Sequence, residues 1–497
     1  MQFIDWYYSR TRVIFYKMLQ LLESSKLEPL QKISLIKYLI RVAGATNLYV
    51  SPEIECSLCN LADSINVDQS LDAVIQKDKV LHVVTKLKSY GGHSRIVERW
   101  IELDTRYKND VVILDPSSEI PKKLNDLIKS QGAEIIVCSE GDEIVRAGQL
   151  RTLASGYNHV VLHVIHVELV HMLAFGTIKF TRPVLFMNHT DHLFWLGSMV
   201  SDCILNMSSK AYEFTATRRG RLDGEVLPIP LSVEATDEKL NKSVIRESLG
   251  LPQKLKVIFS CGHFYKYFPA SINNSFQRIL IDILRRNKNV LIVVVGVRPN
   301  SVVWRLLKFY FSDRLLLIPS CSHLELNRLL SVADVYLDSY PISGFTALCE
   351  AVSKDIPIVP IDTGFAYFDS LCSDLVKQNL VVDKVESMLF HSQKIDGKQR
   401  LLSHFDEAWI KKMHAVINNM ASKHRLYKIR SCSHDVHDLD KTFYYQSAGQ
   451  VVSLKFIKSS IPWGVKVKLV LLLLSHPVFL SISMILRCKS LFYKVIF

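Results

Sequence analysis

Two histidines and an aspartate lie within four positions of one another in the segment 188–197, NHTDHLFWLG. This segment directly follows a short apolar run, 184–187, of the kind that forms a buried strand. Histidine is the usual general base near neutral pH, and a neighbouring carboxylate can orient its ring. We therefore interpret His189, Asp191 and His192 as candidate catalytic residues for proton abstraction.

His163, His166 and Glu168 lie at or after the end of the preceding apolar run, 160–165, so we expect these side chains at the same edge of the sheet. His166 is the reserve candidate for the base, although a lone histidine there is more often structural. The H-x-x-H spacing of His189 and His192 also permits a metal, but no fourth ligand lies nearby, which favours acid–base chemistry. A structural polar turn is the remaining alternative.

A lysine that could meet a phosphate follows the apolar run 257–260. The segment 261–269 reads CGHFYKYFP and contains His263 and Lys266. A lysine a few residues beyond a strand end is well placed to contact a phosphate as a point charge. A solvated lysine is the alternative interpretation.

The segment 333–351 predicts a strand that ends near Asp338, a turn shaped by Pro341 and Gly344, and a helix that begins near Phe345. Hydroxyls and unpaired N–H groups at a helix N-terminus can hold a diphosphate, and a carboxylate one turn further can reach ribose hydroxyls. The candidate nucleotide-sugar-binding residues here are Ser343, Gly344, Phe345, Thr346 and Glu350. The alternative is an ordinary capped helix with a solvated glutamate.

A glycine pair, Gly91 and Gly92, follows the apolar run 80–85 and precedes a helix predicted over 96–103. Two glycines allow close approach of the backbone to a ligand, so both are further candidates for binding an anion. The loop is not a G-x-G-x-x-G dinucleotide motif. A tight strand-to-helix turn explains the pair equally well.

These segments belong to two series of short apolar runs that alternate with helical patterns, which is typical of parallel sheets covered by helices on both faces. The runs are 80–85, 111–114, 135–138, 160–165, 184–187 and 203–206, then 257–260, 290–295, 315–318, 335–337, 356–361 and 380–382. We expect an α/β protein with two doubly wound domains. Ligands in such domains bind beyond the carboxyl ends of the strands.

Four regions follow from this pattern. We expect a helical N-terminal extension over 1–75, an N-terminal Rossmann-like domain over 76–235, a C-terminal Rossmann-like domain over 236–440 and a basic apolar tail over 441–497. The linker is placed at the proline-containing stretch 226–231 and the polar residues 236–243.

Composition supports a folded chain with a distinctive tail. The 497 residues are 48% hydrophobic and carry a net charge of +13, which excludes disordered and low-complexity classes. Eight lysines and arginines, and no acidic residue, lie in 441–497, so the rest of the chain is nearly balanced. This distribution predicts an anionic membrane surface as a partner and no nucleic acid.

The tail contains an uncharged stretch, 469–486, interrupted by Pro477 and flanked on both sides by basic residues. Basic flanks at both ends favour docking in the membrane interface over spanning, and a helix packed on the protein body is a third alternative. The N-terminus lacks the pattern of a secretory signal and the ten cysteines have no framework spacing. We expect a cytoplasmic protein, peripheral at the inner face of the cytoplasmic membrane.

Three segments of the second series resemble GT-B glycosyltransferases. Residues 260–269 are similar to the F-x-x-L-Y-K-x-x-P stretch of the O-linked N-acetylglucosamine transferase family, and residues 337–346 to its L-D-x-x-P-x-x-G-x-T. Residues 350–359 resemble the E-A-x(5)-P-V-V block of many GT-B enzymes. The resemblance covers about 255–365.

This resemblance implies a GT-B fold and a nucleotide sugar, UDP- or GDP-linked, held by the C-terminal domain. It implies that Lys266 and Thr346 contact the diphosphate and that Glu350 binds ribose. Catalysis would need no bound metal, and no cofactor is indicated. Ile342 stands where many retaining GT-B enzymes have a glutamate, which favours inversion without settling it, and Gly-Phe-Thr-Ala replaces two consecutive threonines.

We therefore expect a glycosyltransferase, hexosyl or N-acetylhexosaminyl, that acts on a hydroxyl of a lipid-linked glycan or polysaccharide at the cytoplasmic membrane face. One alternative is a nucleotide-sugar 2-epimerase, which needs no acceptor. Another is a non-catalytic, membrane-bound protein that keeps the GT-B fold.

Overall fold

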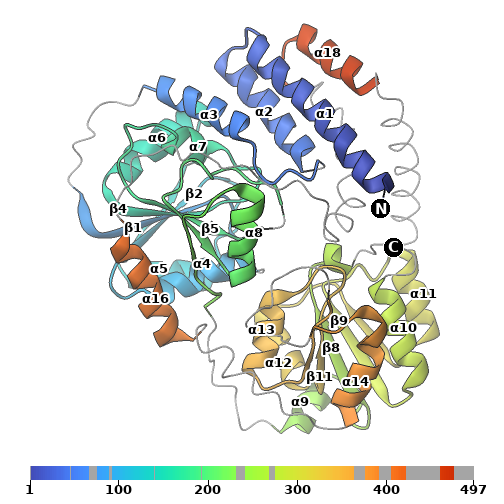
Figure 1. The fold of residues 1–497 in the computed structure, drawn as a ribbon. Coiled ribbons are helices and arrows are strands. Elements are labelled where there is room, and N and C mark those ends of the chain that lie inside the picture. Colours follow the sequence, from blue (N-terminus) through green and yellow to red (C-terminus); the bar gives the residue numbers. More distant parts are fainter. Residues whose placement is uncertain are drawn as a thin grey trace. The chain divides into compact units, whose positions relative to one another are not determined.

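Two compact units make up the chain, each built on its own parallel sheet (Figure 1). A computed structural model describes residues 2–44, 46–66, 75–88, 92–138, 140–191, 193–230, 241–267, 275–362, 375–390, 405–420 and 459–474. Of these, the first unit holds the residues up to 230 and those from 409 onward, and the second holds those between 241 and 408.

The first unit contains a seven-stranded sheet in the order β3-β2-β1-β4-β5-β6-β7, and every neighbouring pair is parallel. The strands are β1 (Gln76–Val84), β2 (Lys108–Ile113), β3 (Ile135–Val137), β4 (Tyr157–His163), β5 (Val184–Asn188), β6 (Cys203–Asn206) and β7 (Gly224–Val226). All six runs of the first series are confirmed as strands. β7 was not predicted, and it includes the first residue of the stretch interpreted as a linker.

Helices cover this sheet, as the alternation of patterns predicts. They are α4 (Gly92–Leu103), α5 (Lys122–Ser130), α6 (Glu143–Ser155), α7 (Val170–Phe175), α8 (Ser209–Arg219) and α16 (Asp406–Asn419). α16 follows the second unit in the sequence but packs on the first unit. It is anchored by Trp409, which is fully buried, packs edge-to-face on Trp100 and donates a hydrogen bond of 2.7 Å to the Pro228 carbonyl.

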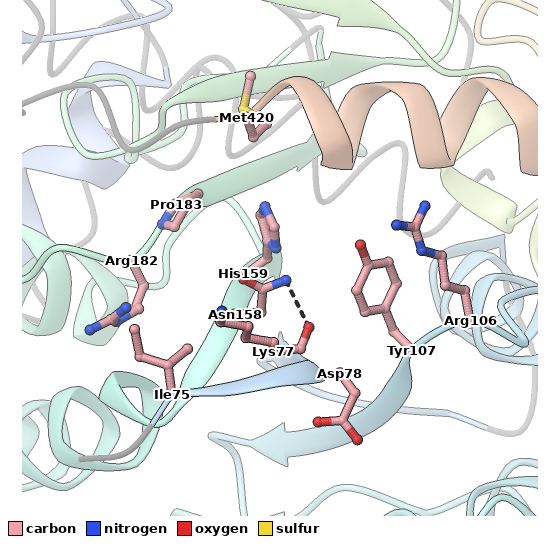
Figure 2. Close-up of a pocket in the computed structure, with 10 residues that line it drawn as sticks. All are labelled: Ile75, Lys77, Asp78, Arg106, Tyr107, Asn158, His159, Arg182, Pro183 and Met420. Carbon is pink, nitrogen blue, oxygen red and sulfur yellow. Dashed lines mark hydrogen bonds between the residues drawn. The ribbon is translucent and has the colours of Figure 1, made fainter.

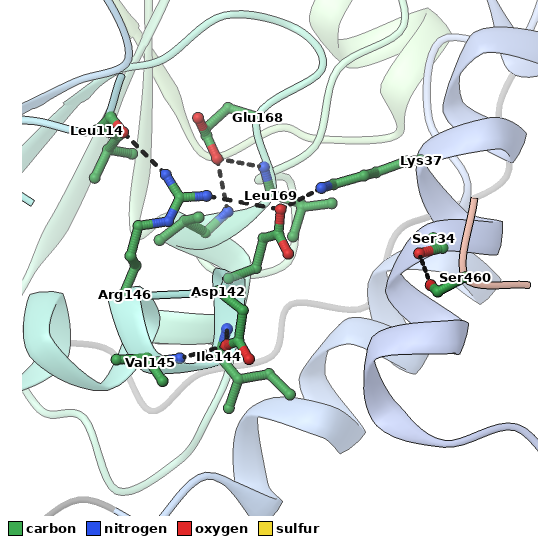
Figure 3. A network of polar contacts seen from close by, with 12 residues as sticks. Ser34, Lys37, Leu114, Asp142, Ile144, Val145, Arg146, Glu168, Leu169 and Ser460 are labelled. Carbon is green, nitrogen blue, oxygen red and sulfur yellow. Dashed lines mark hydrogen bonds and ion pairs between the residues drawn. The ribbon is translucent and has the colours of Figure 1, made fainter. Parts of the chain in front are cut away.

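The predicted N-terminal extension is helical where the structure describes it: α1 (Gln2–Ser24), α2 (Pro29–Ala43) and α3 (Pro52–Ser64). Its apolar side chains, among them Phe15, Ile36 and Leu58, share one buried core with the first sheet and its helices. Polar contacts join the same elements, since Lys37 of α2 pairs with Glu143 of α6 and Arg146 donates to the Leu114 carbonyl at 2.9 Å (Figure 3).

A short helix from the predicted tail, α18 (Trp463–Leu474), lies beside α1 and α2 (Figure 1). Ile461, Val465 and Leu469 are buried in the core of the first unit, and Ser460 hydrogen-bonds Ser34 at 2.6 Å (Figure 3). The predicted apolar stretch 469–486 lies outside the described residues beyond position 474. Among the helices that are described, none has the length and apolar character needed to cross a membrane.

The second unit repeats the plan with a five-stranded parallel sheet in the order β10-β9-β8-β11-β12. The strands are β8 (Lys256–Cys261), β9 (Val290–Val295), β10 (Leu315–Ile318), β11 (Val335–Leu337) and β12 (Ile358–Val359). The helices are α9 (Lys242–Ser248), the 3-10 turn η1 (Phe264–Tyr267), α10 (Phe276–Arg286), α11 (Val302–Tyr310), α12 (His323–Ser331), α13 (Phe345–Ser353), the 3-10 turn η2 (Gln378–Leu380) and α14 (Val381–Phe390).

One predicted strand of this unit, 380–382, is wrong, because those residues end η2 and begin α14. Val381, Val382 and Val385 are all buried, which is a helical spacing. An apolar run of three residues is too short to distinguish a strand from the buried face of a helix.

Candidate functional site

The order of the first sheet reverses between β1 and β4, and a doubly wound sheet opens its ligand crevice at the carboxyl ends of two such strands. Four histidines lie in or near this crevice. His82 is in β1, His93 lies in the first turn of α4, His163 ends β4 and His189 follows β5. His82 and His163 are fully buried, whereas His93 and His189 are partly exposed.

The rings are in direct contact. His163 Nδ1 is 3.1 Å from His189 Nε2, and His163 Nε2 is 3.1 Å from His82 Nδ1. His93 Nε2 donates to the His163 carbonyl at 3.0 Å, and its ring centroid is 4.3 Å from that of His189. The ring nitrogens of His82, His163 and His189 are directed at one another, and among the described residues no group of three or more His, Cys, Asp or Glu side chains is arranged to hold a metal ion.

Burial keeps these rings neutral. It lowers the pKa of His93 to about 4 and holds the pKa of His189 well below the usual value of 6.5, with His93 adding to the effect on His189. The pKa values of His82 and His163 are also lowered, chiefly by burial. A neutral imidazole has one ring nitrogen able to accept a proton, so each ring is in its proton-accepting form at pH 7, although its lowered pKa makes it a weaker base than a free histidine.

We expect the free energy of unfolding to fall steeply as the pH drops below about 6.5. A histidine of the unfolded chain takes up a proton near pH 6.5, whereas the folded protein holds His93 neutral down to about pH 4. The unfolded state therefore binds more protons in this window, and each such ring lowers stability by about 1.4 kcal/mol per pH unit. Urea unfolding at pH 7.5 and 5.5 measures the difference in the free energy of unfolding. His93→Asn should make this difference smaller by the contribution of one histidine ring. Equal stabilities at the two pH values would contradict the assignment of neutral rings.

The other predicted residues of this site have distinct places. Asp191 is buried, and its carbonyl accepts a hydrogen bond of 2.7 Å from Arg219 Nη2. Arg219 also binds the Leu193 and Tyr49 carbonyls and stacks on Trp195, so it fixes the loop after β5 to the N-terminal helices. His166 is half-buried in the turn between β4 and α7. His192 and Gly91 lie outside the described residues, and Gly92 is the first residue of α4.

Sequence reasoning missed His93, because the loop was interpreted through its glycine pair. Two signals could have identified it. His93 directly follows the glycines, and it opens the helix after the first strand of the first series. That position lies at the reversal of strand order in a doubly wound sheet.

A buried carboxylate holds the loop after β5, which also carries His189. Glu55 of α3 accepts hydrogen bonds from the backbone N–H groups of Gly197, Ser198 and Met199 at 3.1, 3.2 and 2.6 Å. Burial raises the pKa of Glu55 to about 7, while these hydrogen bonds oppose the rise. The extension therefore positions the loop that carries His189.

The second sheet reverses its strand order between β8 and β11, and there the second predicted group assembles. Lys266 in η1 donates to the Ser343 carbonyl at 2.7 Å. Asp338, just after β11, accepts from the N–H groups of Ser339 at 2.8 Å and Gly344 at 2.9 Å. Burial raises the pKa of Asp338 to about 6 and lowers the pKa of Lys266.

Two glycines allow the loops of this site to approach closely. A Cβ on Gly344, at the start of α13, would lie 2.6 Å from the Cys261 carbonyl oxygen. Gly296, after β9, has a φ of +90°, and a Cβ there would lie 1.8 Å from the Gly262 carbonyl oxygen. Larger residues would separate the loops that follow β8, β9 and β11.

The remaining predicted binding residues lie near the start of α13 or directly before η1. Phe345 and Thr346 form the first turn of α13, and Glu350 is buried on its second turn. His263 is exposed beside Phe264 and Tyr265. The structure thus brings Lys266, Ser343 and Gly344 together at one sheet edge, as the sequence predicts.

A cavity of about 530 Å³ lies at the opposite end of the first sheet (Figure 2). It is formed at the amino ends of β1 and β4, where Asn158 donates to the Lys77 carbonyl at 3.0 Å. Its other lining residues include Arg106, His159, Arg182 and Met420. Doubly wound sheets bind their ligands at the carboxyl ends, so this cavity is separate from the candidate site.

Two doubly wound units of this kind define the GT-B fold of glycosyltransferases, and solved structures of that class are similar to this chain. HepE of Anabaena in complex with UDP and glucose has a TM-score of 0.53 and 12% identity, covering 69% of this chain and all of its own. Its complex with UDP-glucose has a TM-score of 0.52 at the same identity and coverage. An O-GlcNAc transferase mutant of Thermobaculum terrenum has a TM-score of 0.46 and 13% identity, covering 84% of this chain and 77% of its own.

The sequence matches no protein-family model, and no curated protein is significantly similar to it. At the identities given above, the likeness to solved structures concerns the fold. The predicted GT-B fold is confirmed on that ground.

Proposed function

We propose that this protein is a glycosyltransferase that moves a sugar from a nucleotide-sugar donor to a hydroxyl acceptor. The observation that carries the proposal is the half-buried lysine at the second strand-order reversal. Lys266 lies against Ser343, next to the N-terminus of α13, and the positive end of a helix dipole favours an anion. A cation and a helix N-terminus together suit the diphosphate of a nucleoside diphosphate.

In this proposal the second unit binds the donor. Lys266 and Thr346 hold the diphosphate and stabilise the charge that develops as it leaves, and Glu350 binds the ribose hydroxyls. UDP- and GDP-sugars are the proposed donors, and the UDP in the HepE complexes supports the first. A fixed lysine and backbone N–H groups can neutralise the leaving group, so we propose that transfer needs no bound metal.

The first unit supplies the base that deprotonates the acceptor hydroxyl. His189 is the foremost candidate, because it is neutral, partly exposed and in contact with other histidines at the first reversal. His93 lies against it and is the second. Asp191, His192 and His166 remain candidates from the sequence. A base that takes the proton as the diphosphate leaves on the opposite face leads to inversion.

Thermal unfolding in the presence of nucleoside diphosphates tests donor binding directly. A ligand at one hundred times its Kd stabilises the native state by about 2.7 kcal/mol, so UDP or GDP should raise Tm and phosphate alone should not. Glu350→Ala should remove the preference for the nucleotide. Incubation with nucleotide sugar and no acceptor provides a second check, because an epimerase would convert the sugar and a glycosyltransferase would not. No response to any nucleoside diphosphate would favour the non-catalytic alternative.

We also propose that α18 docks the protein on the cytoplasmic face of the membrane, near a lipid-linked or polysaccharide acceptor. One face of this helix is buried in the first unit. The other presents Trp463, Val467 and Leu471, which are 71%, 41% and 58% exposed and recur every four residues. Lys466 and Lys468 flank this stripe, and an apolar stripe with lysines suits an anionic lipid surface.

Replacing Trp463 and Leu471 together by glutamine should weaken binding to phosphatidylglycerol vesicles at least about tenfold. Each large apolar side chain that enters the interface contributes about 1.5–3 kcal/mol, and neither residue supports the core. Vesicle co-sedimentation measures the change. The matched control is Ile178→Gln, which removes a side chain of the same unit that is 68% exposed and lies outside α18. Unchanged sedimentation of the double variant would remove α18 from the proposal.

A further inference from the structure

A continuous line of polar side chains crosses the interior of the first sheet. Asn109 of β2 begins it, with its Oδ1 atom 2.9 Å from His82 Nε2. The two 3.1 Å contacts already described continue it through His163 to His189. Asn109, His82 and His163 are fully buried, and Trp100 packs edge-on against both buried rings. Among these four described residues, the line is therefore buried except at His189, which is partly exposed.

The direction of every hydrogen bond in this line follows from its inner end. Asn109 Nδ2 is 2.8 Å from the Tyr107 carbonyl, which can only accept, so Asn109 presents its oxygen to His82. His82 must then carry its proton on Nε2 and accept at Nδ1 from His163 Nε2–H. The same rule makes His163 accept at Nδ1 from His189 Nε2–H, because each neutral ring has one donor and one acceptor. Nδ1 of His189 is left without a proton.

A carboxylate lies next to Asn109, at the inner end of the line. Asp104 is fully buried, with Oδ2 at 3.3 Å from Asn109 Nδ2 and Oδ1 at 3.2 Å from His414 Nε2. Asp104 and Asp110 both favour the protonated form of His82 electrostatically. A positive charge is thus better accommodated at the inner histidine than the burial of that ring alone would allow.

We propose that His163 and His82, oriented by Asn109, form a proton relay that keeps Nδ1 of His189 ready to accept a proton and carries the resulting positive charge inward. The proposal rests on the function assigned above, in which His189 is the base. Asn109, His82 and His163 are positioning residues, because they act on the acceptor only through His189.

The relay balances without any added reactant. The acceptor hydroxyl gives its proton to His189 Nδ1 as its oxygen bonds to the sugar and the bond from the sugar to the diphosphate breaks. His189 then passes its Nε2 proton to His163 Nδ1, and His163 passes its Nε2 proton to His82 Nδ1. His82 becomes the imidazolium, bonded to Asn109 and nearest to the buried carboxylates. Loss of one proton from His189 to water and reversal of the hops restore the starting state.

Nitrogen-15 NMR of the histidine-labelled wild-type protein tests the hydrogen-bond direction without any variant. At pH 7.5 we expect His82, His163 and His189 all to be neutral and protonated on Nε2. Protonation of His189 on Nδ1 would overturn the proposal. This spectrum does not depend on the reaction, so a wild-type protein with these tautomers and no transfer activity would count against the proposed function and leave the direction of the hydrogen bonds standing.

Two variants, one within the relay and one outside it, test the relay in a protein that transfers sugar. His163→Gln can still accept from His189 and donate to His82, but an amide does not pass a proton on, so kcat should fall about tenfold or more with KM for the donor unchanged. Asn158→Asp is the matched control, because Asn158 lies at the amino end of the sheet, outside the relay, and its replacement should keep the tautomers and kcat. Melting temperatures confirm that both variants fold. Wild-type kcat in His163→Gln would overturn the relay, as would a donor KM that rises in step with the loss.

Discussion

Replacing Lys266 by methionine should lower kcat for sugar transfer by about 100- to 1,000-fold. The methionine side chain is close to lysine in length but has no charge. It therefore cannot stabilise the departing diphosphate as the lysine does. Loss of one group that stabilises developing charge typically costs this much in rate. Initial rates measured across donor concentrations separate kcat from KM.

The fold should survive this change. Asp338 is the buried carboxylate near Lys266, and its pKa, already raised to about 6 by burial, can rise further so that the group becomes neutral. Lys256→Met is the matched control, since Lys256 is exposed at the amino end of the same strand that leads to Lys266. Equal kcat values for wild type and Lys266→Met would remove Lys266 from the donor site.

Replacing Glu55 by alanine should lower the free energy of unfolding by at least about 3 kcal/mol. The change leaves the N–H groups of Gly197, Ser198 and Met199 buried without their acceptor. Each buried donor without a partner costs about 1–3 kcal/mol. Urea unfolding at pH 7 measures the loss.

The neighbouring carboxylate on the same helix is the control. Glu53 is exposed, and it accepts from the Ser51 hydroxyl, so Glu53→Ala should change stability by less than about 1 kcal/mol. Glu55→Gln keeps one accepting oxygen and should fall between the two. A loss in Glu55→Ala as small as that in Glu53→Ala would show that the loop finds other partners.

The sheets could be predicted because their strands are buried on both faces and appear as continuous apolar runs. Eleven of the twelve predicted runs are strands, and helix α13 begins at the predicted Phe345. The run 380–382 was wrong because three valine or leucine residues suit a helix face equally well. β7 was missed because its sequence, Gly-Glu-Val, has no apolar run.

The approach of Lys266 to Ser343 could be predicted because each follows an apolar strand run, and the carboxyl ends of parallel strands meet at the same end of a sheet. Of the line formed by Asn109, His82, His163 and His189, the sequence predicted only the exposed end. His189 follows a strand, but His82 and Asn109 are single polar residues within or beside apolar runs, and their contact depends on the register of β1 with its neighbours. Sequence spacing does not show which side chains of adjacent strands meet. Glu55 was missed for the same reason, since its partners are more than a hundred residues away.

The packing of Ile461, Val465 and Leu469 against the N-terminal helices has a consequence for synthesis of the chain. A ribosome completes the described part of the second unit before it reaches these residues. The first unit is therefore the first to be synthesised and the last to be completed. Its N-terminal helices leave the ribosome before the residues that cover part of their apolar surface. A shortened chain that stops before position 461 would keep that surface bare, and such a surface is what chaperones bind and what drives aggregation.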